Sequence, residues 1–125
     1  MAINNPYQTY QQNSVITASP QDLSLMLYNG CLKFIKLAKR AMEEGKIEEK
    51  NTNLIKAQAI IQEFQITLDR DIAISEGLAQ LYEYINFRLI EANIKNDMAI
   101  LEEAEGQVKE LRDTWKEAMA LVKGK

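Results

Sequence analysis

The sequence contains no histidine and only one cysteine among its 125 residues. Histidine is the usual general base of hydrolases and the commonest zinc ligand, and a single cysteine forms neither a thiolate metal cage nor an intrachain disulfide. The di-iron sites of helical bundles also need a Glu-x-x-His pair on each of two helices. These absences disfavour most hydrolytic and metal-dependent enzymes. We therefore predict a protein that is not an enzyme and that needs no cofactor.

Positive charge is not in excess, because 15 Lys and Arg residues stand against 18 Asp and Glu residues, for a net charge of −3. Binding of nucleic-acid phosphates needs clustered cations in excess, so we expect no nucleic-acid partner. No stretch approaches the roughly 18 apolar residues of a membrane span, and the N-terminus has neither the basic nor the apolar region of a signal peptide. The composition predicts a cytoplasmic protein that does not insert into a membrane. Cys31 lies among apolar residues and is expected to be a small core residue.

Proline is rare, and both prolines, Pro6 and Pro20, lie near the N-terminus. Residues 1–18 are polar and show no helical apolar period, so they predict a flexible arm. Ser19 is a good N-cap, and Pro20 suits the first position of a helix. Residues 19–125 then predict one helical domain.

Beyond Pro20, apolar residues recur at spacings of three and four, which indicates amphipathic helices. The expected helices span about residues 20–44, 52–69, 76–93 and 98–122. Gly45 is expected to end the first helix, and Asn96 or Asp97 to cap the last. Short connections make neighbouring helices alternate in direction. The predicted fold class is therefore all-α, an antiparallel four-helix bundle.

The first three of these helices carry apolar residues on a second face, away from the seam that we assign to the core. This second set consists of Leu25, Tyr28, Leu32 and Ile35, of Ile55, Ala59 and Ile66, and of Phe87 and Ile90. A contiguous apolar surface of this kind marks a partner site, and an amphipathic segment fits the grooves between helices. The alternative is that these are the scattered apolar side chains that any protein surface carries.

Cations could in principle support another chemistry, in which an all-helical enzyme clamps a small dicarboxylate between its helices. Such a site needs several inward-facing cations. Arg88 and Arg112 lie outside the helix faces that we assign to the core, at positions where surface cations are expected. This reading is therefore disfavoured.

Longer segments carry a resemblance to a known family. They are NPYQTYQQNSVITASPQDL, LMLYNGCLKFIKLAKRAM, and LYEYINFRLIEANIKND followed by LEEAEGQVKELRDTWKEAM. From Tyr7 to Met119 the chain resembles the flagellar secretion chaperone family FliS of Bacillus-like bacteria. The resemblance implies a four-helix bundle that binds the C-terminal segment of flagellin in hydrophobic grooves, in the cytoplasm. It also implies that the chaperone prevents premature polymerisation of flagellin and aids its delivery to the flagellar export apparatus.

The family's N-terminal tyrosine segment maps to Tyr7 and Tyr10. Two interpretations of this arm stay open: it folds over an empty groove until a partner displaces it, or it is a disordered tail. The predicted partner-binding residues are Tyr7, Tyr10, Leu25, Tyr28, Leu32, Ile55, Ala59, Ile66, Phe87 and Ile90. The alternative function is a structural or adaptor bundle that self-associates as a homo-oligomer and has no flagellin client.

Overall fold

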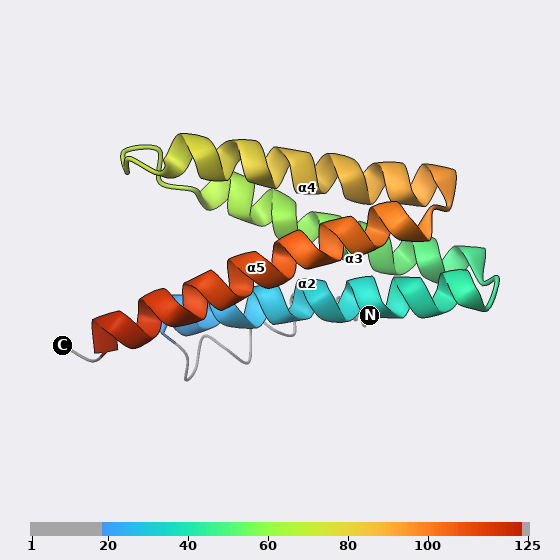
Figure 1. Cartoon of the computed structure of the whole chain (residues 1–125), viewed down its shortest axis with the longest axis horizontal. Coiled ribbons are helices and arrows are strands. Elements are labelled where there is room, and N and C mark those ends of the chain that lie inside the picture. Colours follow the sequence, from blue (N-terminus) through green and yellow to red (C-terminus); the bar gives the residue numbers. More distant parts are fainter. Residues whose placement is uncertain (1–18, 124–125) are drawn as a thin grey trace, which may run out of the picture.

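The structure is a computed structural model that describes residues 19–123. It consists of the helices α2 (Pro20–Glu43), α3 (Ile47–Thr67), α4 (Ser75–Lys95) and α5 (Met98–Lys123), and the described residues contain no strand. Successive helices run in opposite directions, joined by short connections (Figure 1). The predicted all-α fold, an antiparallel four-helix bundle, is confirmed. The expected arm, residues 1–18, lies outside the described residues.

Two helices begin with the side-chain caps that the sequence indicates. The Ser19 Oγ accepts a hydrogen bond from the backbone N–H of Asp22 at 3.2 Å, at the start of α2. At the start of α5, Asp97 Oδ1 accepts from the backbone N–H of Ile100 at 3.1 Å. Each cap satisfies a backbone donor that has no partner within its helix.

Two connections turn through left-handed backbone conformations. Gly45, with φ of 72°, follows the end of α2, where the absence of a Cβ makes this conformation free of strain. Asn96, with φ of 52°, ends α4, and asparagine tolerates this region better than most residues. These residues let the chain reverse within a few positions.

Helix α3 begins at Ile47, whereas the sequence pattern predicts a start near residue 52. The intervening charged residues form the first turn of the helix. Glu48 and Glu49 lie in that turn, where the partial positive charge of the helix N-terminus favours carboxylates. A run of charges that suggests a solvated connection is therefore helical here.

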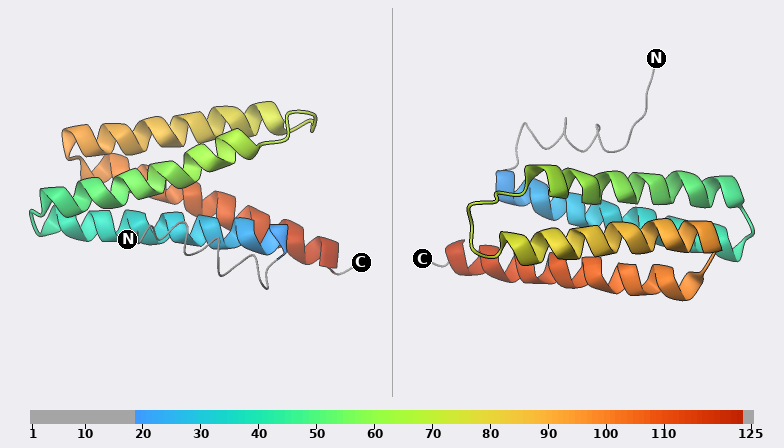
Figure 2. Two further views of the ribbon diagram at one scale, coloured as in Figure 1. Left: turned by 180° about the vertical axis from the view of Figure 1, so that it is seen from behind. Right: turned by 90° about the horizontal axis from the view of Figure 1, so that it is seen from above.

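The helices pack in a ring, so that each one contacts two neighbours. Helix α2 packs against α3 and α5, and α4 packs against the same two helices (Figures 1 and 2). Trp115 of α5 also donates its indole N–H to the carbonyl of Gln21 at 3.0 Å, which ties α5 to the start of α2. The outer faces of the α3–α4 pair and of the α2–α5 pair consequently lie on opposite sides of the bundle.

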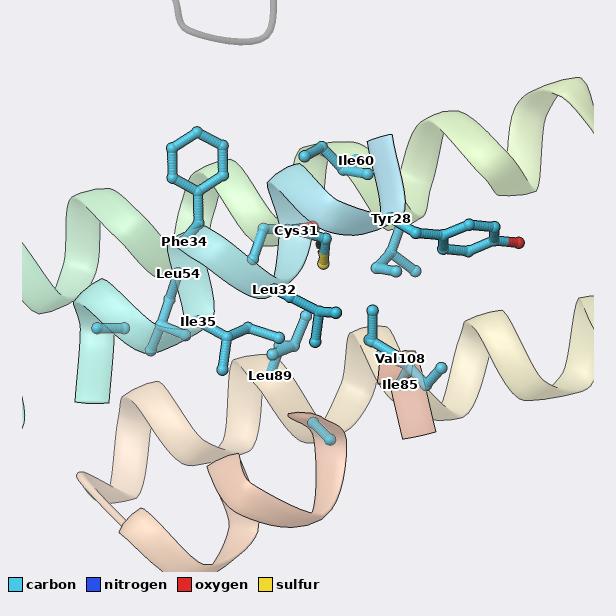
Figure 3. Close-up of a cluster of buried hydrophobic side chains, with 14 of the residues drawn as sticks. Tyr28, Cys31, Leu32, Phe34, Ile35, Leu54, Ile60, Ile85, Leu89 and Val108 are labelled. Atoms are coloured by element: carbon cyan, nitrogen blue, oxygen red, sulfur yellow. Dashed lines mark hydrogen bonds between the residues drawn. The ribbon is translucent and has the colours of Figure 1, made fainter. Parts of the chain in front are cut away.

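The core lies along the axis of this ring and draws side chains from all four helices (Figure 3). The largest fully buried side chains are Cys31 and Ile35 of α2, Leu54, Ile60 and Ile61 of α3, Ile85 and Leu89 of α4, and Leu101 and Val108 of α5. The prediction that Cys31 is a core residue is confirmed.

The prediction that α2 exposes a second apolar face is wrong. Tyr28, Leu32 and Ile35 are buried in the core, and Leu25 is half-buried. Helix α2 packs against both α3 and α5, and the residues of its second apolar set lie within the arc that these contacts bury, which is wider than a single seam. The second apolar set of α2 therefore belongs mainly to the core of the bundle.

Lys50 is a buried cation that joins α3 to the end of α4. Its side chain is only 4% exposed, and its Nζ donates to the carbonyl oxygen of Asn93 at 3.0 Å and to Asn96 Oδ1 at 3.1 Å. The carbonyls at the C-terminus of a helix lack intrahelical partners and carry partial negative charge. Lys50 therefore caps α4 from a neighbouring helix.

We predict that Lys50→Met lowers the free energy of unfolding by about 1 to 3 kcal/mol, because it leaves buried acceptors without a donor. Urea denaturation followed by circular dichroism measures this loss. The matched control is Lys33→Met at an exposed position of α2 that makes no ion pair within the described residues. Equal stability of the two variants would contradict the capping role.

Candidate partner-binding surface

A stack of three aromatic rings sets the register of α2, α3 and α4. The ring of Phe64 stacks on Tyr28 with centroids 4.4 Å apart and on Tyr82 with centroids 5.7 Å apart. The hydroxyl groups of Tyr28 and Tyr82 share a hydrogen bond of 3.0 Å. Burial raises the pKa of both tyrosines above its ordinary value of 10.0, so both hydroxyls keep their protons further into the alkaline range. The cluster has a structural role.

The register determines which outer residues of α3 and α4 lie side by side. Helices α3 and α4 are antiparallel, Phe64 meets Tyr82, and Lys50 meets Asn93. Counting along the two helices from these contacts places Ile55 at the level of Ile90, and Ala59 at the level of Phe87. Apolar side chains from two helices thus gather on one outer face.

We call this surface the α3–α4 strip. It consists of Ile55, Ala59 and Ile66 of α3 and of Phe87, Ile90 and Ile94 of α4. Ile55 and Phe87 are 59% and 57% exposed, and Ile66 and Ile94 are both 79% exposed. Ala59 is also exposed, and Ile90 is half-buried. An apolar surface of this extent, drawn from two helices, is typical of a site that a partner covers.

The strip contains half of the residues that the sequence predicts as partner contacts. The outward orientation of Ile55, Ala59, Ile66 and Phe87 is as expected, and their contact with a partner remains a prediction. The structure brings Tyr28 and Leu32 into the core instead, and Leu25 lies half-buried on α2, away from the strip. Tyr7 and Tyr10 lie outside the described residues.

Ile94 is absent from the predicted contacts although the structure exposes it within the strip. The expected third helix ends at residue 93, whereas α4 continues to Lys95. The spacing in the sequence does indicate that Ile94 lies on the same helix face, because it follows Ile90 by one helical turn and Phe87 by two.

The edge of α4 that faces α5 is polar, in contrast to the strip. Arg88 Nε pairs with Glu103 at 2.6 Å, and the hydroxyl of Tyr84 donates to the same carboxylate at 3.0 Å. Glu91 bonds both Lys95 and Arg88, which holds the pKa of its carboxyl below the usual value. These partly exposed pairs contribute little to stability individually, but they define the boundary of the strip.

The described residues contain no cluster of metal ligands, and their cysteine, Cys31, is buried. They contain no group of three or more His, Cys, Asp and Glu side chains able to hold a metal ion. Burial raises the pKa of the Cys31 thiol to about 12, and its Sγ lies 3.7 Å from the carbonyl oxygen of Ala57. A protonated and enclosed thiol is a poor nucleophile. In addition, none of the described helices is long and apolar enough to cross a membrane.

Comparisons with known proteins agree on one family. The family model described as flagellar protein FliS matches residues 3–122. The flagellar secretion chaperone FliS of Bacillus subtilis is 58% identical over 119 residues, which cover 95% of this chain and 90% of that protein. The FliS chaperone of Escherichia coli is 32% identical over 86% of this chain and 82% of its own length. That of Campylobacter jejuni is 33% identical, with 94% and 93% covered.

We predict that Cys31 does not react with iodoacetamide at about pH 8 in the folded protein and reacts after unfolding in urea. The thiol has an ordinary pKa of 9.0 and a folded-state pKa of about 12. The unfolded chain therefore releases this proton first, and the stability contributed by the protonated thiol is complete below pH 9 and declines above it.

Alkylation followed by mass spectrometry measures the first effect. Urea denaturation across the alkaline range measures the second, with Cys31→Ala as the control that should lose stability less steeply. Rapid labelling of the folded protein would show that the thiol is accessible.

Proposed function

Since the chain belongs to the FliS family, we propose that it is a flagellar export chaperone that binds the C-terminal segment of flagellin. The names of its relatives support the role of a chaperone in flagellar secretion. The proposal that it binds the C-terminal segment of flagellin is supported by the resemblance of the sequence and by the exposed α3–α4 strip.

The observation that carries the proposal is the exposure of the strip. Four large apolar side chains, those of Ile55, Ile66, Phe87 and Ile94, lie more than half exposed on one outer face. Burial of a large apolar side chain contributes roughly 1.5 to 3 kcal/mol, so four of them supply on the order of 6 to 12 kcal/mol. Ordering a flexible ligand offsets several kcal/mol, and other contacts add to the sum. Affinity in the micromolar range, about 8 kcal/mol, is within reach.

The chaperone acts by binding and performs no chemistry. An apolar flagellin tail that is free to contact other subunits promotes filament growth. A tail that covers the strip is withheld from such contacts, so binding competes with polymerisation. In this proposal the competition takes place in the cytoplasm, before the client reaches the export apparatus. We do not propose that the strip binds nucleic acid or a membrane.

A second copy of the chain is the competing occupant of the strip. The same exposed side chains would support a self-associating bundle without a client. The two proposals differ in stoichiometry, because a chaperone takes up one tail for each chain, whereas a homo-oligomer leaves no strip free.

We predict that Ile55→Glu and Phe87→Glu each weaken binding of a flagellin C-terminal peptide by at least about tenfold, because a carboxylate would be buried against an apolar ligand. Isothermal titration calorimetry measures the affinity, and circular dichroism should show unchanged helicity, since both positions are exposed.

The matched control is Leu121→Glu, an equivalent change at a 72% exposed position of α5, outside the strip. It should leave the affinity unaltered. Undiminished affinity of the two strip variants, with helicity retained, would contradict the proposal.

A further inference from the structure

A groove between α2 and α5 gathers positive charge on the side of the bundle opposite to the α3–α4 strip. Two hollows, of about 400 Å³ and about 560 Å³, share the lining residues Leu32, Lys36 and Arg112 and are therefore adjacent. We call them together the basic groove. Lys33 and Arg40 of α2 line one part, and Lys109 of α5 lines the other.

Most of these cations have no carboxylate partner. Arg112 pairs with Asp113 at 3.0 Å, and the neighbouring Lys39 pairs with Glu105 at 2.9 Å and Glu102 at 3.4 Å. By contrast, within the part of the chain that the structure describes, the remaining four make no ion pair: Lys33, Lys36, Arg40 and Lys109. The chain as a whole carries a charge of −3, so this local excess of positive charge is a feature of the groove.

The groove also has an apolar component and an open space. Leu32 lies buried at its base, and Leu37 is 37% exposed at its side. On α5, Gly106 lines the hollow, and a Cβ added there would meet no atom within 4 Å. Glycine in the middle of a helix lowers its stability relative to alanine, and no packing among residues 19–123 requires it here. The missing side chain keeps the groove open.

We propose that the basic groove binds an acidic, partly apolar segment of a second protein. Carboxylates of this segment would pair with Lys33, Lys36, Arg40 and Lys109, and an apolar residue would cover the exposed part of Leu37. Charge complementarity of this kind steers association and sets specificity.

Other occupants fit the groove less well. Residues 1–18 of the chain contain no Asp or Glu, so they offer the cations no carboxylate. A nucleic acid would pair its phosphates with the cations but would leave the exposed apolar surface of Leu37 uncovered. An acidic peptide suits both features, because it can place carboxylates and apolar groups alternately.

The position of the groove permits two partners at once. Helices α2 and α5 pack against each other, as do α3 and α4, and the outer faces of these pairs lie on opposite sides of the ring (Figure 2). A segment in the basic groove would leave the α3–α4 strip free. The chain would then connect the protein bound on the strip to a second, acidic protein.

Fluorescence anisotropy with a labelled peptide of repeated Glu-Glu-Leu-Leu units tests the proposal. The full chain should bind this peptide, should bind the matching Gln-Gln-Leu-Leu peptide at least about tenfold more weakly, and should lose affinity as salt is raised. Lys36→Glu should weaken binding of the acidic peptide by about tenfold or more, because Lys36 lines both hollows. Arg70→Glu, the same charge change on an exposed residue between α3 and α4, is the control and should have no effect.

Gly106→Leu separates the groove from the overall charge. It should block the peptide without lowering the melting temperature, since it replaces glycine in a helix and its Cβ meets no atom within 4 Å. Gly77→Leu in α4, which also faces open space, is its control. Both groove variants should still bind the flagellin peptide, so a failure of this proposal is distinct from a failure of the strip.

Four results would overturn the proposal. They are the absence of binding, equal binding of the two peptides, tighter binding of a labelled single-stranded oligonucleotide, and self-association that Lys36→Glu abolishes. The last result would assign the groove to a second copy of the chain.

Discussion

The stacking of Phe64 between Tyr28 and Tyr82 fixes how α2, α3 and α4 lie relative to one another, and the surface follows from it. The rings come from three helices, and the hydrogen bond between the two tyrosine hydroxyls closes the cluster. Because the helices are rigid, one fixed contact determines the level of every other residue along them. The stack thereby sets Ala59 beside Phe87, and apolar residues of α3 and α4 form one surface.

The ring of helices leaves two outer surfaces of opposite character. Both sides of α2 that face a neighbour are filled with apolar side chains, so its outer face carries cations such as Lys36 and Arg40. Helices α3 and α4 differ, because they also carry apolar side chains outside the core, among them Ile55 and Phe87. The net charge of −3 does not indicate that the cations gather on one outer surface, because a net charge says nothing about where the charges lie. The described part of the chain therefore presents one apolar and one basic outer surface.

Periodicity predicts which residues of α3 face the core, because Leu54, Ile61 and Phe64 follow one stripe and are buried. It fails on α2, since a stripe does not show how wide an arc of the helix its neighbours bury, and Tyr28 is buried where a single seam would expose it. The basic groove is beyond sequence analysis for a related reason. Its cations lie far apart in the sequence, at positions such as Lys36 and Lys109, and meet only in the folded bundle.

The central claim is that this member of the FliS family binds the C-terminal segment of flagellin. Size-exclusion chromatography with full-length flagellin, and with flagellin that lacks this segment, tests it most directly. The account predicts a stoichiometric complex with the full-length protein and separate elution of the truncated one. Co-elution with the truncated protein, or self-association of the chain without uptake of either form, would contradict it.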